Sequence, residues 1–185
     1  MTASERGVEV LAPFFEDLDT WNQFDVVAAF SVLEHVRDPI KFLSRARGAA
    51  HDESKLWLEV PNSLVPTVGA SEYFGFEHLL HFTEESLRLA MNRTGWRLEA
   101  VDETEEKRLR AIATASAEDL TPAASSNYRR MRAIIAEHGR PLSRLTRASP
   151  RAYGRPCRQV GKSRCGGQVF IRGPSSVSTQ VSGIW

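Results

Sequence analysis

Three runs of residues between positions 24 and 62 decide the fold: FDVVAAF at 24–30, SVLEHVRDP at 31–39 and KLWLEVPN at 55–62. The first run is almost continuously apolar and partly β-branched, which is typical of a strand covered on both faces in a parallel sheet. The third run predicts a second short strand. That strand should end at Pro61, because proline has no N–H to donate to a neighbouring strand.

A helix is expected between these two strands. Asp38 can accept hydrogen bonds from the first N–H groups of the helix, and Pro39 suits its first position. Apolar residues three or four apart define its buried face: Ile40, Leu43, Ala46 and Ala50. Strand, helix and strand form a βαβ unit, and ligands of such sheets gather at the carboxyl ends of the strands. The unit therefore points to residues 31–35, Pro61 and Asn62 as a candidate site.

These runs resemble the region of the fourth and fifth strands in class I S-adenosylmethionine-dependent methyltransferases. Further along, HLLHFTEESL at 78–87 and TGW at 94–96 are similar to the histidine, helix and sixth-strand segment of that family. The resemblance extends over about residues 7–103. It implies an α/β fold, a Rossmann-like class I methyltransferase sheet with helices on both faces. It also implies S-adenosylmethionine as cofactor and a small molecule as methyl acceptor.

The start of the chain departs from the family pattern. Residues 7–11 match the third strand of the family, but only residues 1–6 precede them. The family has a glycine-rich loop upstream that lets the backbone approach the cofactor, and no such loop precedes any strand here. The resemblance therefore implies that the first βαβ unit is missing. The strand at 24–30 would then have an exposed edge, and we expect self-association unless another element covers it.

The resemblance also assigns roles to individual residues. Six residues are implied to lie along the cofactor: Phe14, Phe15, Ser31, Val32, Leu33 and Glu34. His78 or His35 is implied to be the catalytic base, since a neutral imidazole can accept a proton near pH 7. From the residues alone, the favoured interpretation of His78 is an imidazole that bonds to the backbone of its own loop, and the resemblance brings the two interpretations level. His81 is interpreted in that second, structural way.

A metal site at Glu34 and His35 is a further alternative. Two adjacent residues of a helix do not point in the same direction, and a carboxylate in the first turn of a helix is already stabilised by the helix dipole. No other set of ligands with metal spacing is visible in the sequence. No metal is therefore expected.

The sequence predicts three parts. Residues 1–103 form a partial methyltransferase domain, 104–141 a helical extension, and 142–185 a basic, largely irregular tail with a last strand at 167–173. Residues 104–118 are charged and alanine-rich and are interpreted as a helix, and a second helix at 126–138 should end at Gly139 and Pro141. The run QVFIR at 168–172 is interpreted as the seventh strand of the family, which pairs antiparallel.

Composition and charge narrow the class of protein. A length of 185 residues suits one domain with a sizeable core, and the net charge is +1. Residues 1–120 carry 12 basic and 22 acidic side chains, whereas residues 121–185 carry 12 basic and one acidic. The basic end lacks the interleaved aromatic residues of a nucleic-acid groove, so a nucleic-acid partner is not expected.

With no apolar run long enough for a bilayer and no export pattern, we expect a cytoplasmic protein that does not enter a membrane.

A second function remains open from the sequence. A chain that keeps the sheet but lacks the glycine-rich loop can be a non-catalytic, methyltransferase-like remnant that acts as an interaction module. Cofactor binding distinguishes this hypothesis from the enzyme.

Overall fold

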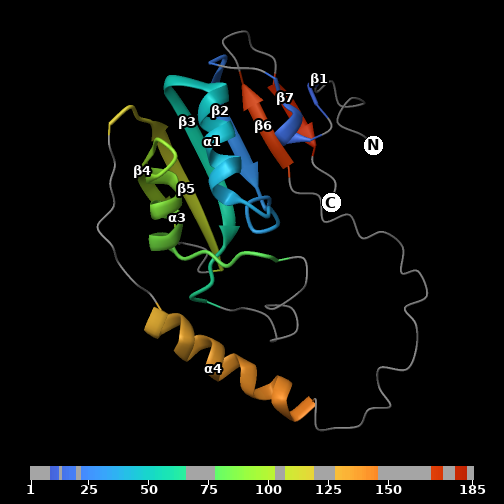
Figure 1. Ribbon diagram of the computed structural model, residues 1–185, viewed down its shortest axis with the longest axis vertical. Coiled ribbons are helices and arrows are strands. Elements are labelled where there is room, and N and C mark those ends of the chain that lie inside the picture. Colours follow the sequence, from blue (N-terminus) through green and yellow to red (C-terminus); the bar gives the residue numbers. More distant parts are fainter. Residues whose placement is uncertain are drawn as a thin grey trace, which may run out of the picture.

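The computed structural model describes residues 9–12, 14–19, 22–65, 78–102, 107–118, 128–145, 168–172 and 178–182. These residues form one seven-stranded sheet in the order β1-β7-β6-β2-β3-β5-β4 (Figure 1). The strands are β1 (Glu9–Val10), β2 (Phe24–Phe30), β3 (Ala50–Pro61), β4 (Trp96–Asp102), β5 (Arg108–Ala115), β6 (Gln168–Arg172) and β7 (Ser178–Ser182). The helices are the 3-10 turn η2 (Phe15–Asp17), α1 (Pro39–Ala49), α3 (Glu84–Asn92) and α4 (Tyr128–Leu145).

The predicted βαβ unit is present at the centre of the sheet. β2 and β3 are parallel neighbours joined by α1. Asp38 caps α1, because its Oδ1 accepts a hydrogen bond from the Lys41 N–H at 2.9 Å, and Pro39 takes the first helical position. The buried face of α1 packs on the sheet through Phe42, Leu43, Ala46 and Ala49. The α/β class and the order of these elements are confirmed.

Helices α1 and α3 lie on the same face of the sheet and contact each other. Side chains alternate along a strand, so Leu56, Leu58 and Val60 of β3 are fully buried on this face. On the opposite face Trp57 is 45% exposed and lies beside Ile112 of β5, which is 42% exposed. Neither α1 nor α3 covers that second face.

The turn between α3 and β4 follows the predicted pattern. Thr83 caps α3, accepting from the Ser86 N–H at 3.2 Å. Gly95 ends the turn with a φ of +78°, a left-handed conformation that favours glycine. Trp96 then enters the core, and its indole Nε1 donates to the Leu43 carbonyl at 3.1 Å. This bond links the first residue of β4 to the middle of α1.

Replacing Gly95 by alanine should lower the free energy of unfolding by about 1–2 kcal/mol, because alanine is strained at positive φ. The added Cβ would also lie only 3.3 Å from the Ser116 carbonyl oxygen. Denaturant titration measures the change. Gly48→Ala, inside α1, is the matched control and should leave stability unchanged or raise it by up to about 1 kcal/mol. Equal losses in both variants would contradict the conformational explanation.

The helix predicted at 104–118 is wrong, since Arg108–Ala115 is the strand β5. It runs antiparallel to both β3 and β4 and is inserted between them. The alanine content favours a helix, but apolar and polar side chains alternate along this segment, and that alternation with a period of two matches the strand that forms. It places alternate residues on the buried face: Leu109, Ala111, Ala113 and Ala115. Packing on the sheet overrides the local propensity.

The interpretation of 168–172 as an antiparallel strand is correct, but its assignment as the seventh strand of the family is wrong. β5 already occupies the antiparallel position beside β3. β6 instead pairs with the other edge of β2, where Ala28 lies opposite Phe170, and Val169 is buried there. β7 pairs with β6 and β1 pairs in parallel with β7. The expected unpaired edge of β2 is therefore covered, and the β6–β7 hairpin stands where a doubly wound sheet has the strands of its first half.

Helix α4 extends from Tyr128 to Leu145 and continues through Gly139 and Pro141, where the sequence predicts its end. A proline removes one hydrogen bond and disfavours a helix without obliging it to stop. Tyr128 and Ile135 of α4 are 67% and 45% exposed. None of the helices within the described ranges has the length and apolar character needed to cross a membrane.

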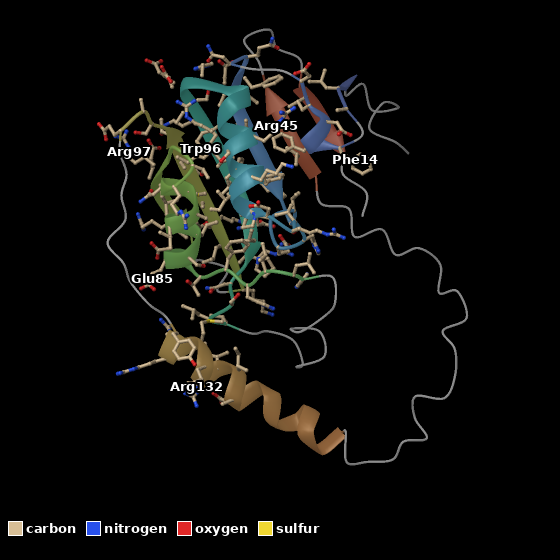
Figure 2. All side chains as sticks on the ribbon, in the orientation of Figure 1. Phe14, Arg45, Glu85, Trp96, Arg97 and Arg132 are labelled. Carbon is tan, nitrogen blue, oxygen red and sulfur yellow. The ribbon has the colours of Figure 1, made fainter. Side chains whose placement is uncertain are left out.

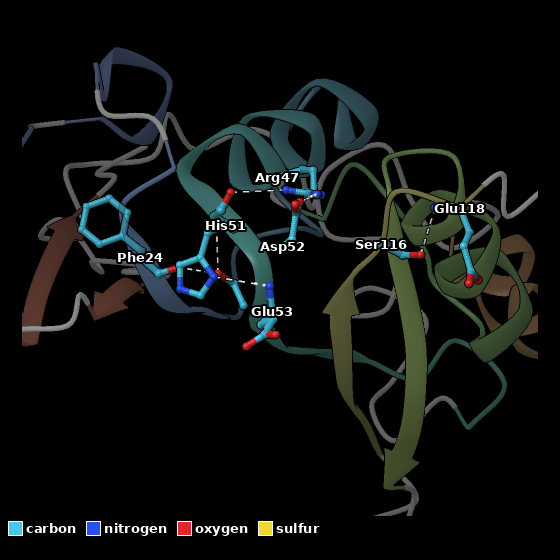
Figure 3. A network of polar contacts seen from close by, with 9 residues as sticks. Phe24, Arg47, His51, Asp52, Glu53, Ser116 and Glu118 are labelled. Carbon is cyan, nitrogen blue, oxygen red and sulfur yellow. Dashed lines mark hydrogen bonds and ion pairs between the residues drawn. The ribbon is translucent and has the colours of Figure 1, made fainter.

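A polar network holds the amino end of the central strands (Figure 3). His51 Nε2 lies 2.8 Å from Asp25 Oδ1, which joins β3 to β2. Arg47 at the end of α1 donates to Asp52 Oδ1 at 2.9 Å. This network lies at the end of the sheet opposite the carboxyl ends of β2 and β3, so it stabilises the junctions of the βαβ unit away from the candidate site.

Candidate functional site

The candidate site begins where β2 ends. Phe30 pairs with Glu59 of β3, and the Ser31 N–H then donates to the Glu59 carbonyl at 3.0 Å. Ser31 has a φ of +52°, which is uncommon for a residue other than glycine. Strained residues of this kind gather at functional sites, where the surrounding structure holds them in place. Here the left-handed residue follows the last residue of β2 and precedes the turn at 33–35.

Residues 33–35 form a turn rather than the first turn of a helix. The His35 N–H donates to the Val32 carbonyl at 2.9 Å, and Val32 and Leu33 are buried. In this turn Glu34 and His35 point together, with Glu34 Oε1 3.8 Å from His35 Nε2. The expectation that the two side chains diverge is wrong, because it assumed helical backbone at these positions.

The Glu34 carboxyl group is the most deeply buried titratable group of the site. The residue is 2% exposed, and its Oε2 has no hydrogen-bond partner among the residues that the structure describes. Burial raises the pKa of this carboxyl group, while a backbone hydrogen bond and the charges of His35 and Arg108 act in the opposite direction. A buried carboxylate without a full set of partners is an unfavourable arrangement unless a proton or a cation completes it.

His78 reaches the same place from the segment before α3. The rings of His35 and His78 meet edge to face, with centroids 5.0 Å apart and planes at 65°. The Leu80 N–H donates to the Glu34 carbonyl at 3.1 Å, which fixes residues 78–80 against the turn after β2. The structure therefore brings together three of the predicted site residues, Glu34, His35 and His78. Residues 66–77 of the loop before His78 lie outside the described residues.

Two arginines of β5 complete the polar edge of the site and were missed in the sequence. Arg108 Nη1 donates to Glu59 Oε1 at 2.7 Å and to Ser31 Oγ at 3.1 Å. Arg110 Nε donates to Glu59 Oε2 at 2.8 Å. The signal that could have found them is the alternation of Arg108 and Arg110 with apolar residues, which places both arginines on one face of a strand.

Asn62, predicted at this edge, connects β3 to the segment before α3. Asn62 forms a bridge with Phe82, and its Oδ1 accepts from the Leu64 N–H at 3.0 Å. The Ser63 N–H donates to the Phe82 carbonyl at 2.9 Å. These bonds position the chain that carries His78.

Phe14 and Phe15 occupy different environments. Phe15 is 3% exposed, and the centroid of its ring lies 4.8 Å from that of the Phe42 ring. Phe15 therefore fills the core between η2 and α1. Phe14 is 43% exposed, and Figure 2 shows it on the side of the molecule formed by β1 and the β6–β7 hairpin. Of the two, Phe14 has the free surface to meet a ligand.

A mixed sheet with a central βαβ unit and polar groups at its carboxyl edge defines a Rossmann-like class of protein. Residues 4–101 match the family model described as "Methyltransferase domain". The chain therefore belongs to the methyltransferase domain family. No curated protein matches the sequence.

Two solved structures, described first, show the same fold, and a third is also similar. One is a SAM-dependent methyltransferase from Aquifex aeolicus, 19% identical with a TM-score of 0.50, over 61% of this chain and 59% of that one. Another is a SAM-dependent methyltransferase from Thermotoga maritima, named as a possible histamine N-methyltransferase, 18% identical with a TM-score of 0.52, over 60% of this chain and 66% of that one. A third is Burkholderia thailandensis 1,6-didemethyltoxoflavin-N1-methyltransferase with bound S-adenosylhomocysteine, 16% identical with a TM-score of 0.45, over 55% of this chain and 48% of that one. The chain thus spans between about half and two thirds of the length of these proteins.

Proposed function

We propose that this protein binds S-adenosylmethionine at the carboxyl edge of β2 and transfers its methyl group to a small-molecule acceptor. The observation that carries the proposal is the strained turn after β2, which gathers Glu34, His35 and His78 at the edge where doubly wound sheets bind ligands. Membership of the methyltransferase family supports the same reaction.

The proposed cofactor contacts follow the chain around this edge. Ser31, Val32, Leu33 and Glu34 run along the cofactor, and the exposed ring of Phe14 covers the adenine. Phe15 has an indirect role, because its buried ring packs against Phe42 and supports the turn that presents Phe14. His35 and His78 face the methyl acceptor.

The proposed chemistry is an in-line displacement. A lone pair of the acceptor oxygen or nitrogen attacks the methyl carbon, and the carbon–sulfur bond breaks with its electron pair passing to sulfur. The acceptor loses one proton, which His78, or His35 beside it, accepts as general base. The products are the methylated acceptor and S-adenosylhomocysteine. The protein contributes mainly by aligning the two reactants, since the sulfonium already activates the methyl group.

The second candidate is the non-catalytic interaction module. It is favoured by the open sheet face, where Trp57 and Ile112 expose apolar surface side by side. Exposed apolar patches on sheets mark surfaces for partners or for self-association. The two candidates make opposite predictions for cofactor binding.

Titration of the purified chain with S-adenosylmethionine in a calorimeter should give saturable binding of one molecule per chain. Phe14→Ala should weaken this binding by about 5-fold, because a stacked aromatic contact contributes about 1 kcal/mol. Tyr128→Ala removes an exposed aromatic ring from α4, away from the proposed site, and should leave this binding unchanged. A well-folded chain that shows no saturable heat would favour the interaction module.

A further inference from the structure

Three metal-ligating side chains meet at the carboxyl edge of β2. One ligand atom each of Glu34, His35 and His78 can be chosen so that all three atoms lie within 4.8 Å of one another. We call these residues the Glu–His–His cluster. It is the one group of three such side chains found among the described ranges. Two of its members come from the turn after β2 and the third from the segment before α3.

The buried carboxylate gives a second, independent indication of a ligand. Glu34 is 2% exposed, and its Oε2 lacks a hydrogen-bond partner within the described part of the chain. Removing a carboxylate oxygen from water without a partner costs several kcal/mol. A cation held between Glu34 and the two imidazoles would supply the missing partner.

We propose that the Glu–His–His cluster binds one divalent transition-metal ion, with Zn²⁺ as its typical occupant. Two imidazole nitrogens and one carboxylate oxygen form a donor set that suits zinc and leaves one coordination position open. Ligand atoms around a tetrahedral zinc ion lie about 3.4 Å apart, given bonds of about 2.0–2.1 Å. The cluster therefore needs to contract by about 1.5 Å at most. Rotation of the His35 and His78 rings about their side-chain bonds would have to provide this movement.

The charges around the cluster are compatible with a cation. Arg108 is the nearby positive group, and its guanidinium is bound to Glu59 Oε1 at 2.7 Å. Arg110 binds the other oxygen of the same carboxylate. Two arginines and one glutamate leave one net positive charge, and the Glu34 carboxylate offsets it. Imidazoles bind metal in their neutral form, so they add no charge of their own.

A metal ion here would change the proposed chemistry at the acceptor. With their lone pairs on the metal, His35 and His78 can no longer accept a proton. A hydroxyl group of the acceptor could instead take the open position, where zinc lowers the pKa of a bound water to about 7. The ion held by Glu34, His35 and His78 would thus supply the acidification of the acceptor hydroxyl group, whose proton would pass to solvent. This consequence rests on the proposed methyl transfer, whereas the metal site itself does not.

The test is a calorimetric titration of the chelator-treated full chain with ZnCl₂, without cofactor or acceptor. We expect one ion per chain, and His35→Gln and His78→Gln should each weaken binding by at least about 100-fold, the upper range for loss of a supporting group around a metal. His51→Gln is the matched control, because His51 also lies beside a carboxylate, Asp25, but at the opposite end of β3. Its affinity for zinc should equal that of the unchanged chain.

Three outcomes would overturn the site: no zinc binding, binding that survives in both His35→Gln and His78→Gln, or an equal loss in His51→Gln. Glu34→Gln should also weaken binding, and circular dichroism must first show that this buried variant folds. His78 is only half-buried, so His78→Gln keeps the test decisive if Glu34→Gln does not fold. A preparation that binds S-adenosylmethionine but does not bind zinc contradicts the metal site alone. A preparation that binds zinc but does not bind S-adenosylmethionine contradicts the proposed function alone.

Discussion

Replacing His78 by alanine should lower the turnover of methyl transfer to a hydroxyl acceptor by about 10²–10⁴-fold, the usual contribution of a general base. His78 lies beside His35, where an acceptor at the carboxyl edge of β2 would lose its proton. Affinity for S-adenosylmethionine should hardly change, because the cofactor is proposed to follow residues 31–34. A turnover assay and a cofactor titration on the same preparation separate the two effects.

His81→Ala is the internal control for this prediction. His81 lies three residues further along the same segment, and we expect its loss to affect stability more than turnover. Unchanged turnover in His78→Ala would move the base to His35 or indicate an acceptor that needs no deprotonation. Lost cofactor binding in His78→Ala would instead mean that this segment covers the cofactor.

The assay also separates the two roles of His78. If it acts only as a base, the activity of the unchanged chain should survive treatment with a chelator. If the Glu–His–His cluster holds a catalytic metal, the chelator should lower turnover by a similar factor to the substitution, and added Zn²⁺ should restore it. The substituted chain should not recover with zinc.

Replacing Val169 by aspartate should make the protein self-associate more strongly than the unchanged chain. Val169 is 2% exposed in β6, and burying a charge there should cost about 3–5 kcal/mol, enough to release the strand. The edge of β2 would then expose unpaired N–H and C=O groups, which pair readily with other chains. Light scattering over a concentration series measures the change in mass.

Ile112→Asp is the matched substitution on the open sheet face. Ile112 is 42% exposed, so the new charge stays in water and the sheet should remain intact. This variant should be no more associated than the unchanged chain. A Val169→Asp chain that stays monomeric at high concentration would show that β6 does not protect β2.

The sequence predicts the βαβ unit well because its signals are local. Asp38 and Pro39 mark the start of α1, Pro61 ends β3, and Gly95 supplies the positive φ before β4. Each of these effects acts within a few residues, so neighbouring sequence is sufficient to read it.

The errors concern long-range pairing. The alanines of β5 favour a helix locally, but β3 and β4 on either side recruit the segment into the sheet. β6 was recognised as a strand, yet nothing in its five residues specifies β2 as its partner. Register and partner choice depend on the faces that the rest of the sheet leaves available.

The site was predicted in its residues but not in its geometry. Resemblance pointed to Glu34, His35 and His78, whereas their convergence depends on the backbone of Ser31, whose positive φ has no sequence signal. Serine rarely adopts a positive φ, so local rules do not predict the turn that follows Ser31, and helical backbone was assumed at Glu34 and His35. Arg108 was missed for a related reason, because its strand was interpreted as a helix.

The pairing of β2 with β6 also sets an order of events during synthesis. Ala28 finds its partner Phe170 only after about 140 further residues have been translated. At about 5–20 residues per second this takes roughly 7–30 s, far longer than a local helix or hairpin needs to form. Throughout that interval the edge of β2 that will pair with β6 is unpaired in the nascent chain. Cellular chaperones that bind extended apolar segments would have their longest access to this protein there, at residues 24–30.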